Sequence, residues 1–147
     1  IGICDNNVID EINILEATKR AMVQSIEKAD KMLQKRNLGS LDHVLIDAVK
    51  LTGISQTQTN IIKGDATSLS IAAASIVAKV TRDRMIDDIR SEFDVNIGSG
   101  YPSDHYTMDF IRSWIEENGR APAHVRCSWE PVRQMLSKRA NTKLTDW

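Results

Sequence analysis

The stretch that decides the fold is Lys63-Gly-Asp-Ala-Thr-Ser-Leu-Ser-Ile-Ala-Ala-Ala-Ser-Ile-Val-Ala-Lys-Val-Thr-Arg-Asp-Arg84. It runs from a glycine-containing turn into a helix of small and apolar residues, and it ends in an Arg-Asp-Arg cluster. A helix that is small or apolar on nearly every side is typical of a buried helix. We therefore predict a buried helix, extending to about Phe93, that presents a single carboxylate, Asp83.

The Asp83 carboxylate has two interpretations. Burying an acid costs free energy unless a cation or hydrogen bonds compensate, so a partly buried Asp83 indicates a metal ion or an arginine partner. The alternative is a surface salt bridge with Lys79, one helical turn earlier, which stabilises a helix only slightly. The spacing alone leaves both interpretations open.

Apolar residues upstream of this stretch recur three, four or seven positions apart from about Asn6 onward. This spacing predicts an amphipathic helix with a break near Asn13. The helix should end around Asn37-Leu-Gly39, where Gly39 supplies the C-cap conformation.

Two short strands are expected next. Residues 43–51 are too few and too rich in β-branched side chains for a helix, so they predict a buried strand with Asp47 in its middle. The polar residues 52–60 predict a loop, and Ile61-Ile-Lys63 predicts a second strand that leads into the Gly64 turn.

The C-terminal part predicts two further helices. Residues 96–104 are dense in turn formers and predict a loop around one aromatic residue, after which a helix runs from about Asp104 to Asn118 and Gly119 closes it. Ser128 is the expected N-cap of a final helix. The whole pattern predicts an α/β domain with a small sheet over residues 1–139 and a flexible tail over residues 140–147.

Composition sets broad limits on function. The chain has 147 residues, enough for one domain, and its 19 basic and 20 acidic side chains create no global field that attracts nucleic acid. Cys4 and Cys127 lie far apart without metal-ligand spacing, which favours thiols in a reducing compartment. No apolar run has the length of a membrane span and no leader opens the chain, so we expect a soluble cytoplasmic protein without a membrane partner.

Two aspartates are candidates for metal chemistry. Mg²⁺ and Mn²⁺ prefer oxygen ligands, so Asp47 on a strand and Asp83 on a helix are suitable ligands if they converge. Two-metal hydrolysis of a phosphodiester needs several carboxylates, and two are too few. The alternative is that Asp47 only ends a strand in a turn and Asp83 only forms a salt bridge.

Two other features are weaker signals. Lys63 and Gly64 before a helix have the ingredients of a phosphate-binding turn, although most such turns are ordinary loops. Tyr101, between Gly100 and Pro102, is held in a stiff turn where it either stacks on a sugar or base or covers a core.

Together these segments resemble type 2 ribonuclease H, the ribonuclease HII family. The resemblance extends over nearly the whole chain, and the long middle block is its most specific part. The matching segments are Ile9-Asp-Glu-Ile-Asn-Ile14, Leu45-Ile-Asp47, Lys63 to Asp83, Gly98-Ser-Gly-Tyr-Pro-Ser-Asp104 and Val125-Arg-Cys-Ser-Trp129. The last two are similar to the archaeal and eukaryotic branch, whereas Ile9-Asp-Glu-Ile-Asn13 and Lys63-Gly-Asp65 are more similar to bacterial members. Of the two sources we expect the archaeal one.

The resemblance implies a ribonuclease H-like fold and an endoribonuclease that cuts the RNA strand of RNA/DNA hybrids. It also implies cleavage 5′ of a single ribonucleotide in duplex DNA, leaving 3′-OH and 5′-phosphate ends, with Mg²⁺ or Mn²⁺ held by four carboxylates. Asp47 and Asp83 match two of these ligands. Tyr101 matches the tyrosine that packs at the ribose. Candidates for phosphate contacts or for orienting the carboxylates are Lys63, Gly64, Lys79, Arg82 and Arg84.

One part of the family pattern is missing. The other two carboxylates belong to an N-terminal Asp-Glu-x-Gly-x-Gly motif, and Asp10-Glu11 does not replace it, because no glycine pair follows. We therefore expect this chain to be the C-terminal two thirds of a family member, inactive alone, with the motif upstream of Ile1. The alternative is a non-catalytic remnant that binds nucleic acid.

The last seven residues resemble a sliding-clamp-binding peptide. Asn141 stands where that peptide has Gln, Leu144 is its aliphatic residue, and Trp147 is its one aromatic. The resemblance implies a DNA sliding clamp as a partner, whereas the alternative is a disordered tail.

Overall fold

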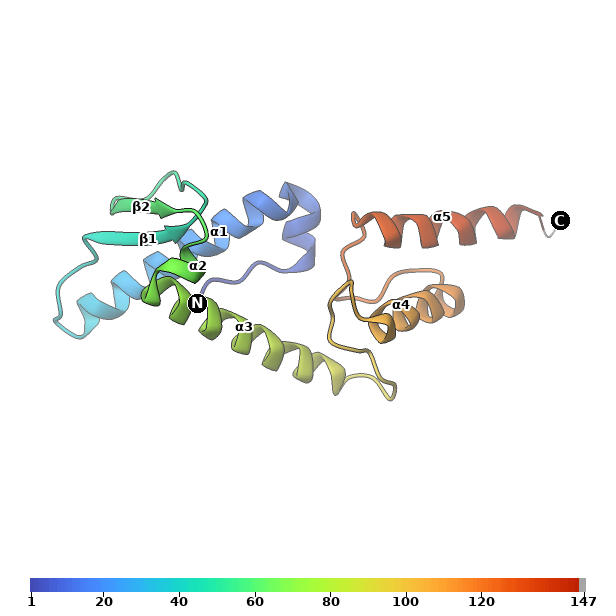
Figure 1. The fold of residues 1–147 in the computed structure, drawn as a ribbon. Coiled ribbons are helices and arrows are strands. Elements are labelled where there is room, and N and C mark those ends of the chain that lie inside the picture. Colours follow the sequence, from blue (N-terminus) through green and yellow to red (C-terminus); the bar gives the residue numbers. More distant parts are fainter. Residues whose placement is uncertain (146–147) are drawn as a thin grey trace. The chain divides into compact units, whose positions relative to one another are not determined.

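The computed structural model describes the backbone of residues 1–145 and the side chains of residues 1–141. These residues form two compact units (Figure 1). Unit 1 contains Ile1–Cys4 and Ile12–Thr81, and unit 2 contains Asp5–Glu11 and the chain from Arg82 onward. The element order mixes helices with one small parallel sheet, so the predicted α/β class is confirmed.

The first helix, α1 (Asn6–Lys35), is interrupted where the sequence predicts. Asn13 has φ 66° and ψ 166°, which no helical residue adopts. Its side-chain oxygen accepts hydrogen bonds from the N–H groups of Leu15 (3.0 Å) and Glu16 (3.2 Å). Asn13 therefore ends one helical segment and acts as the N-cap of the next.

Asn37, and not Gly39, takes the left-handed position that closes α1. Its φ is 55°, its N–H donates to the Gln34 carbonyl, and the Leu38 N–H donates to the Leu33 carbonyl, both at 3.0 Å. These two bonds form a Schellman motif, and asparagine tolerates the left-handed conformation better than most residues do. The predicted C-cap was wrong by two positions.

The sheet consists of β1 (His43–Asp47) and β2 (Thr57–Ile61), paired in parallel from His43↔Thr57 to Asp47↔Ile61. β1 is shorter than predicted, and Asp47 is its last residue, because Ala48 turns to φ 58°. Of the five β1 side chains only Ile46 is buried, so the prediction of a buried strand was wrong.

β2 also differs from the prediction, because four of its residues lie in the predicted loop. Its side chains are mostly polar, and they conceal the strand from a search for apolar patterns. Gln58 explains part of its stability, since its side chain accepts the Leu51 N–H (3.0 Å) and donates to the Leu51 carbonyl (2.9 Å). The main-chain segment at Leu51 is thereby fixed beside the strand by a polar side chain.

The quoted stretch forms two helices, α2 (Gly64–Thr67) and α3 (Leu69–Arg90), separated by the extended residue Ser68. The prediction of a single buried helix reaching Phe93 was wrong on both length and burial. Within the described residues Ile71 is the one buried side chain of α3, and residues 73–80 are all exposed. Small side chains allow another element to pack closely against a helix, but they do not ensure that such an element is present.

Unit 2 is built on α4 (His105–Asn118) and α5 (Glu130–Thr145). The limits predicted for α4 are confirmed: Asp104 accepts the Tyr106 N–H as N-cap, and Gly119 closes the helix with φ 73°. The buried residues of the core are Ile111, Ile115 and Val132. Partly buried side chains packed against them are Phe110, Ala121, Val125, Trp129, Met135 and Leu136.

The start of α5 corrects another prediction. The Ser128 hydroxyl does not cap the helix but donates to Asp10 at 2.5 Å, and α5 begins at Glu130. Its last turns include residues 140–145, where we expected an aperiodic tail. Trp147 of the expected clamp-binding peptide lies outside the described residues.

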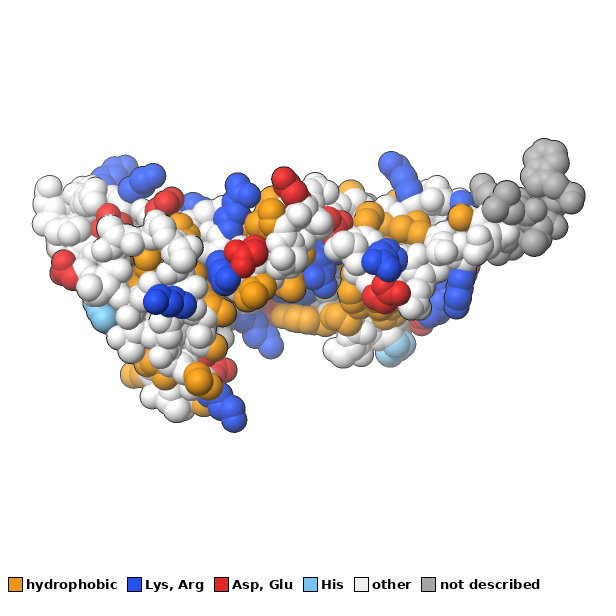
Figure 2. Space-filling model, turned by 90° about the horizontal axis from the view of Figure 1, so that it is seen from above, with side chains coloured by type: hydrophobic (Ala, Val, Ile, Leu, Met, Phe, Trp, Pro, Cys, Tyr) orange, Lys and Arg blue, Asp and Glu red, His pale blue; other side chains and the backbone are white. Residues whose placement is uncertain are grey.

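The surface carries both charge signs. Lys and Arg side chains are interspersed with Asp and Glu on the face drawn in Figure 2, and apolar side chains also reach that surface. None of the helices in the described part of the chain combines the length and the apolar character that a membrane crossing requires.

Ile115→Ala should lower the free energy of unfolding by about 2–5 kcal/mol, because Ile115 is only 1% exposed and its truncation leaves a cavity. The matched control is Ile76→Ala, which makes the same chemical change at a side chain that is 64% exposed and should shift stability by less than about 0.5 kcal/mol. Urea denaturation followed by circular dichroism measures both. Equal losses would contradict the assignment of the core.

Candidate active site

The first candidate residue, Asp47, lies at the end of β1 in unit 1. Its half-buried carboxylate accepts the Gly64 N–H at 2.9 Å, which joins the strand end to the start of α2. A Cβ on Gly64 would lie 2.6 Å from the Ile71 side chain and 3.5 Å from the Asp47 carboxylate. An added Cβ would therefore clash with the end of the Ile71 side chain, whereas its contact with Asp47 would be of ordinary van der Waals length.

In the predicted phosphate-binding turn, one of the N–H groups that a phosphate would need already has a partner within the protein. The N–H of Gly64 is already donated to Asp47. Lys63 adopts a left-handed conformation with φ 55°, and its side chain is exposed. α2 has four residues, too few for the dipole of a longer helix. Lys63 thus remains as an exposed cation beside the Asp47 strand end.

The second candidate, Asp83, lies on α3 at the start of the unit 2 segment. Its carboxylate pairs with the neighbouring Arg82 at 3.3 Å and not with Lys79, and its side chain is 46% exposed. The sequence predicted either a metal ion or an arginine as the partner of a partly buried Asp83. The structure shows an arginine, but the Asp83 side chain is only modestly buried. A pair this exposed contributes little stability, so Asp83 remains available for other partners.

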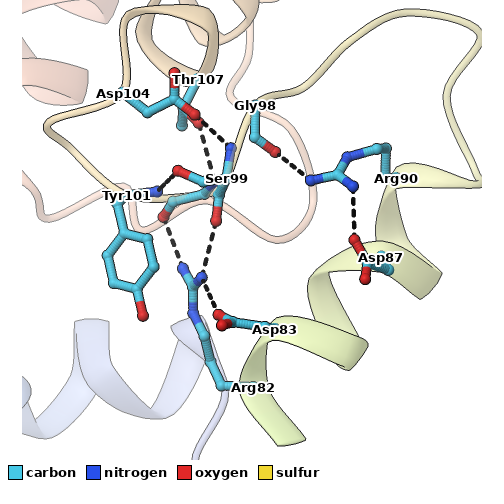
Figure 3. Close-up of polar contacts among 10 residues, drawn as sticks. Arg82, Asp83, Asp87, Arg90, Gly98, Ser99, Tyr101, Asp104 and Thr107 are labelled. Carbon is cyan, nitrogen blue, oxygen red and sulfur yellow. Dashed lines mark hydrogen bonds and ion pairs between the residues drawn. The ribbon is translucent and has the colours of Figure 1, made fainter. Parts of the chain in front are cut away.

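Arg82 is the centre of a hydrogen-bond network that Figure 3 shows. Its guanidinium donates to the Ser99 carbonyl at 2.8 Å and to the Gly100 carbonyl at 2.9 Å. It also lies over the Tyr101 ring, 3.8 Å from the ring centroid, in cation–π geometry. Arg82 is thus engaged with the loop around Tyr101 as well as with Asp83.

The loop that carries Tyr101 is held from its other side by the first turn of α4 (Figure 3). The Ser99 N–H donates to Asp104 at 2.5 Å, and the Gly100 N–H donates to the Thr107 hydroxyl at 2.9 Å. Thr107 is 7% exposed and donates in turn to the Ile97 carbonyl at 3.0 Å. The Tyr101 side chain, 39% exposed, is therefore presented by a fixed backbone.

The structure does not group the remaining candidates. Lys79 and Arg84 are exposed on α3. Asp47 belongs to unit 1 and Asp83 to unit 2. Among the described residues no three His, Cys, Asp or Glu side chains lie close enough to hold a metal ion. The described residues therefore do not form a complete divalent-metal site by themselves.

Several residues that shape the site were not predicted. Thr107 and Arg90 hold the Tyr101 loop, Arg90 by donating to the Gly98 carbonyl at 2.8 Å. The position of Asp104 before a helix indicates that it is an N-cap, but no sequence pattern indicates its hydrogen bond with Ser99. Asp10 contacts residues 117 and 118 positions away, which no local pattern reveals.

Asp10 fastens the segment before α5 within unit 2. It accepts hydrogen bonds from the N–H groups of Cys127 (2.7 Å) and Ser128 (3.1 Å) and from the Ser128 hydroxyl. Burial raises the pKa of Asp10, but these hydrogen bonds and the charge of Arg126 outweigh burial and lower the pKa below its ordinary 3.8. The pKa of Asp104 is lowered too, mainly by the Ser99 N–H.

Acid should therefore weaken unit 2. The folded-state pKa values of Asp10 and Asp104 lie below the unfolded ones, so their stabilisation is present above the unfolded pKa and is lost as the pH falls through the folded pKa. We expect the urea concentration at the unfolding midpoint to decrease once the pH is lowered below about 4. Asp10→Asn should flatten this drop, while the exposed Asp109→Asn should not. Identical pH profiles for both variants and the parent would refute this role of Asp10.

Comparison with solved structures defines the class of protein. The structure is similar to the crystal structure of ribonuclease H2 from Pyrococcus horikoshii OT3, with a TM-score of 0.66 and 27% sequence identity over 92% of this chain and 67% of that chain. The likeness confirms the predicted ribonuclease H-like fold.

The family follows from the sequence match. A family model described as Ribonuclease HII matches residues 5–132. The chain belongs to the ribonuclease HII family, and the resemblance inferred from its motifs is confirmed. The matched range includes Asp47, Asp83 and Tyr101.

Proposed function

We propose that the complete gene product containing this chain is an endoribonuclease that hydrolyses the RNA strand of RNA/DNA hybrids and cuts 5′ of single ribonucleotides in duplex DNA. The observation that carries the proposal is the fixed loop that holds Tyr101 in the same Arg82 network as the Asp83 carboxylate, in a chain of the ribonuclease HII family. An aromatic ring and an acid on rigid supports suit a substrate that differs from DNA at its ribose.

Asp47 and Asp83 are the proposed carboxylate ligands for Mg²⁺ or Mn²⁺. Each is partly exposed, and each is held by one neighbour, the Gly64 N–H for Asp47 and Arg82 for Asp83. Divalent ions take oxygen ligands, and members of this family generally depend on such an ion. Two separate carboxylates are too few for two-metal hydrolysis, so the proposal requires further carboxylate ligands.

Substrate contacts are proposed for Tyr101 and for exposed cations. The 2′-hydroxyl is the group by which a protein distinguishes RNA from DNA at one position. Tyr101 is accessible enough to pack against that ribose. Phosphate contacts are proposed for Lys63, Lys79 and Arg84, whose side chains are exposed. Gly64 supports Asp47 and does not contact phosphate in this proposal.

Two finer points stay predictions. A cytoplasmic location is expected from the composition. Binding of a sliding clamp through Asn141, Leu144 and Trp147 is tested by deleting residues 140–147 and measuring affinity for the clamp. Unchanged affinity would show that these residues do not bind the clamp.

The proposed activity is tested on three duplexes of one sequence: RNA/DNA hybrid, DNA/DNA and RNA/RNA. We expect the complete gene product with Mn²⁺ or Mg²⁺ to cut the RNA strand of the hybrid, to spare the DNA duplex, and to lose activity in a chelator. Residues 1–147 alone should be inactive. Hybrid binding without cleavage by the complete product would favour the alternative, a non-catalytic nucleic-acid-binding protein.

A further inference from the structure

The Arg82 guanidinium has more partners than a phosphate-binding arginine requires. It bonds two consecutive carbonyls, those of Ser99 and Gly100, pairs with the Asp83 carboxylate, and covers one face of the Tyr101 ring. Only a planar group with several donors in a fixed fork satisfies these contacts together. Both terminal nitrogens of the guanidinium are therefore already engaged in contacts within the protein.

The same two residues are also held through their N–H groups, independently of Arg82. Asp104 accepts the Ser99 N–H and Thr107 accepts the Gly100 N–H, both from the start of α4. The backbone before Tyr101 is thus anchored even without Arg82. Among the contacts of the described residues, the ring of Tyr101 is oriented by Arg82, 3.8 Å from its centroid. Removal of Arg82 should free the ring more than the loop.

We infer that Arg82 is a positioning residue that orients the Tyr101 ring and ties it to the Asp83 carboxylate. This inference rests on the proposed function, in which Tyr101 packs at the ribose. It removes Arg82 from the candidate phosphate contacts and gives it a role in ribose selection. A lysine at position 82 keeps the charge but lacks the fork and the planar face, so it does not replace arginine here.

The test compares Arg82→Lys and Arg82→Ala with Arg112→Ala, an exposed arginine of α4 paired with Asp109. Cleavage of a duplex with one embedded ribonucleotide gives kcat and KM. Salt-dependent binding of the same duplex without metal counts the phosphate contacts. We expect both Arg82 variants to lose about 10- to 100-fold in kcat/KM, the range of other positioning partners, with the salt slope unchanged and Arg112→Ala like the parent.

The opposite pattern would overturn the inference: a lysine variant that keeps most activity, with an alanine variant whose salt slope falls by about one, is the signature of a phosphate contact. A second readout needs no activity. In nuclear magnetic resonance spectra, Arg82→Lys should shift the Tyr101 ring signals more than the Ser99 and Gly100 amide signals. Unmoved ring signals would refute the positioning role, whereas a parent that cuts no hybrid would refute the proposed function alone.

Discussion

Asp47→Asn and Asp83→Asn should each lower cleavage of an RNA/DNA hybrid by at least about 100-fold in the complete gene product. Removal of a carboxylate ligand is costlier than loss of an outer partner, which typically costs about 10- to 100-fold. The amide keeps the size of the side chain, and at position 47 it keeps an oxygen to accept the Gly64 N–H. The loss is therefore expected without unfolding.

The control for this pair is Asp109→Asn, which removes an equally charged, 60% exposed carboxylate from a surface pair with Arg112. It should cut hybrids within about twofold of the parent, since exposed pairs of this kind contribute little. Initial rates at saturating Mn²⁺ and thermal unfolding curves are measured for all three variants. Parent-like cleavage by both the Asp47 and Asp83 variants would show that the assigned ligands are wrong.

Gly98→Ala should destabilise unit 2 by about 2–4 kcal/mol, from backbone strain and overpacking combined. Gly98 has φ +71°, and an added Cβ would lie 2.6 Å from the backbone nitrogen of Thr107. That nitrogen belongs to α4 and cannot move aside as a flexible side chain can. The Tyr101 loop must shift instead, so cleavage should fall with stability.

The matched control is Gly39→Ala, where φ is +87° and no atom lies within 4 Å of the added Cβ. It carries the strain of a positive φ without the clash, about 1–2 kcal/mol. Urea unfolding of both variants separates the two costs. Equal destabilisation would mean that the close packing of Gly98 against α4 contributes nothing.

Local signals predicted the break in α1 and the limits of α4. Asn13, Asp104 and Gly119 have side-chain chemistry or backbone freedom that acts within a few residues, so the break in α1 and the limits of α4 were readable. Asn37 shows the limit of such reading, because either of two nearby residues was able to take the left-handed position. Residue propensities identified the candidates for the left-handed position, and the hydrogen bonds of the folded chain determine which candidate takes it.

Burial and strand pairing were harder to predict. The polar strand β2 exists because main-chain groups pair with β1 and because Gln58 bonds Leu51, and neither contact leaves an apolar pattern. The small residues of α3 suggested a buried helix, but residues 73–80 are exposed. Burial depends on a partner surface, which the sequence of one helix does not contain.

The sequence named candidate site residues, whose roles stay predictions, but it did not indicate the contacts that connect them. Asp83, Arg82 and Tyr101 were singled out, but the contact between Arg82 and the Tyr101 loop joins residues 17 and 18 positions apart through carbonyls that every sequence has. The bond from Ser128 to Asp10 depends in the same way on the folded chain. The family resemblance suggested the roles of these residues, and the structure shows the hydrogen bonds that hold them in place.

The most direct test of the account uses duplex DNA with one embedded ribonucleotide, cut by the complete gene product and mapped at single-nucleotide resolution. We predict one cut, immediately 5′ of the ribonucleotide, with 3′-OH and 5′-phosphate ends, and none in the all-DNA duplex. Cleavage of both duplexes, or of neither while a long hybrid is cut, would contradict recognition of a single ribose by the Tyr101 loop.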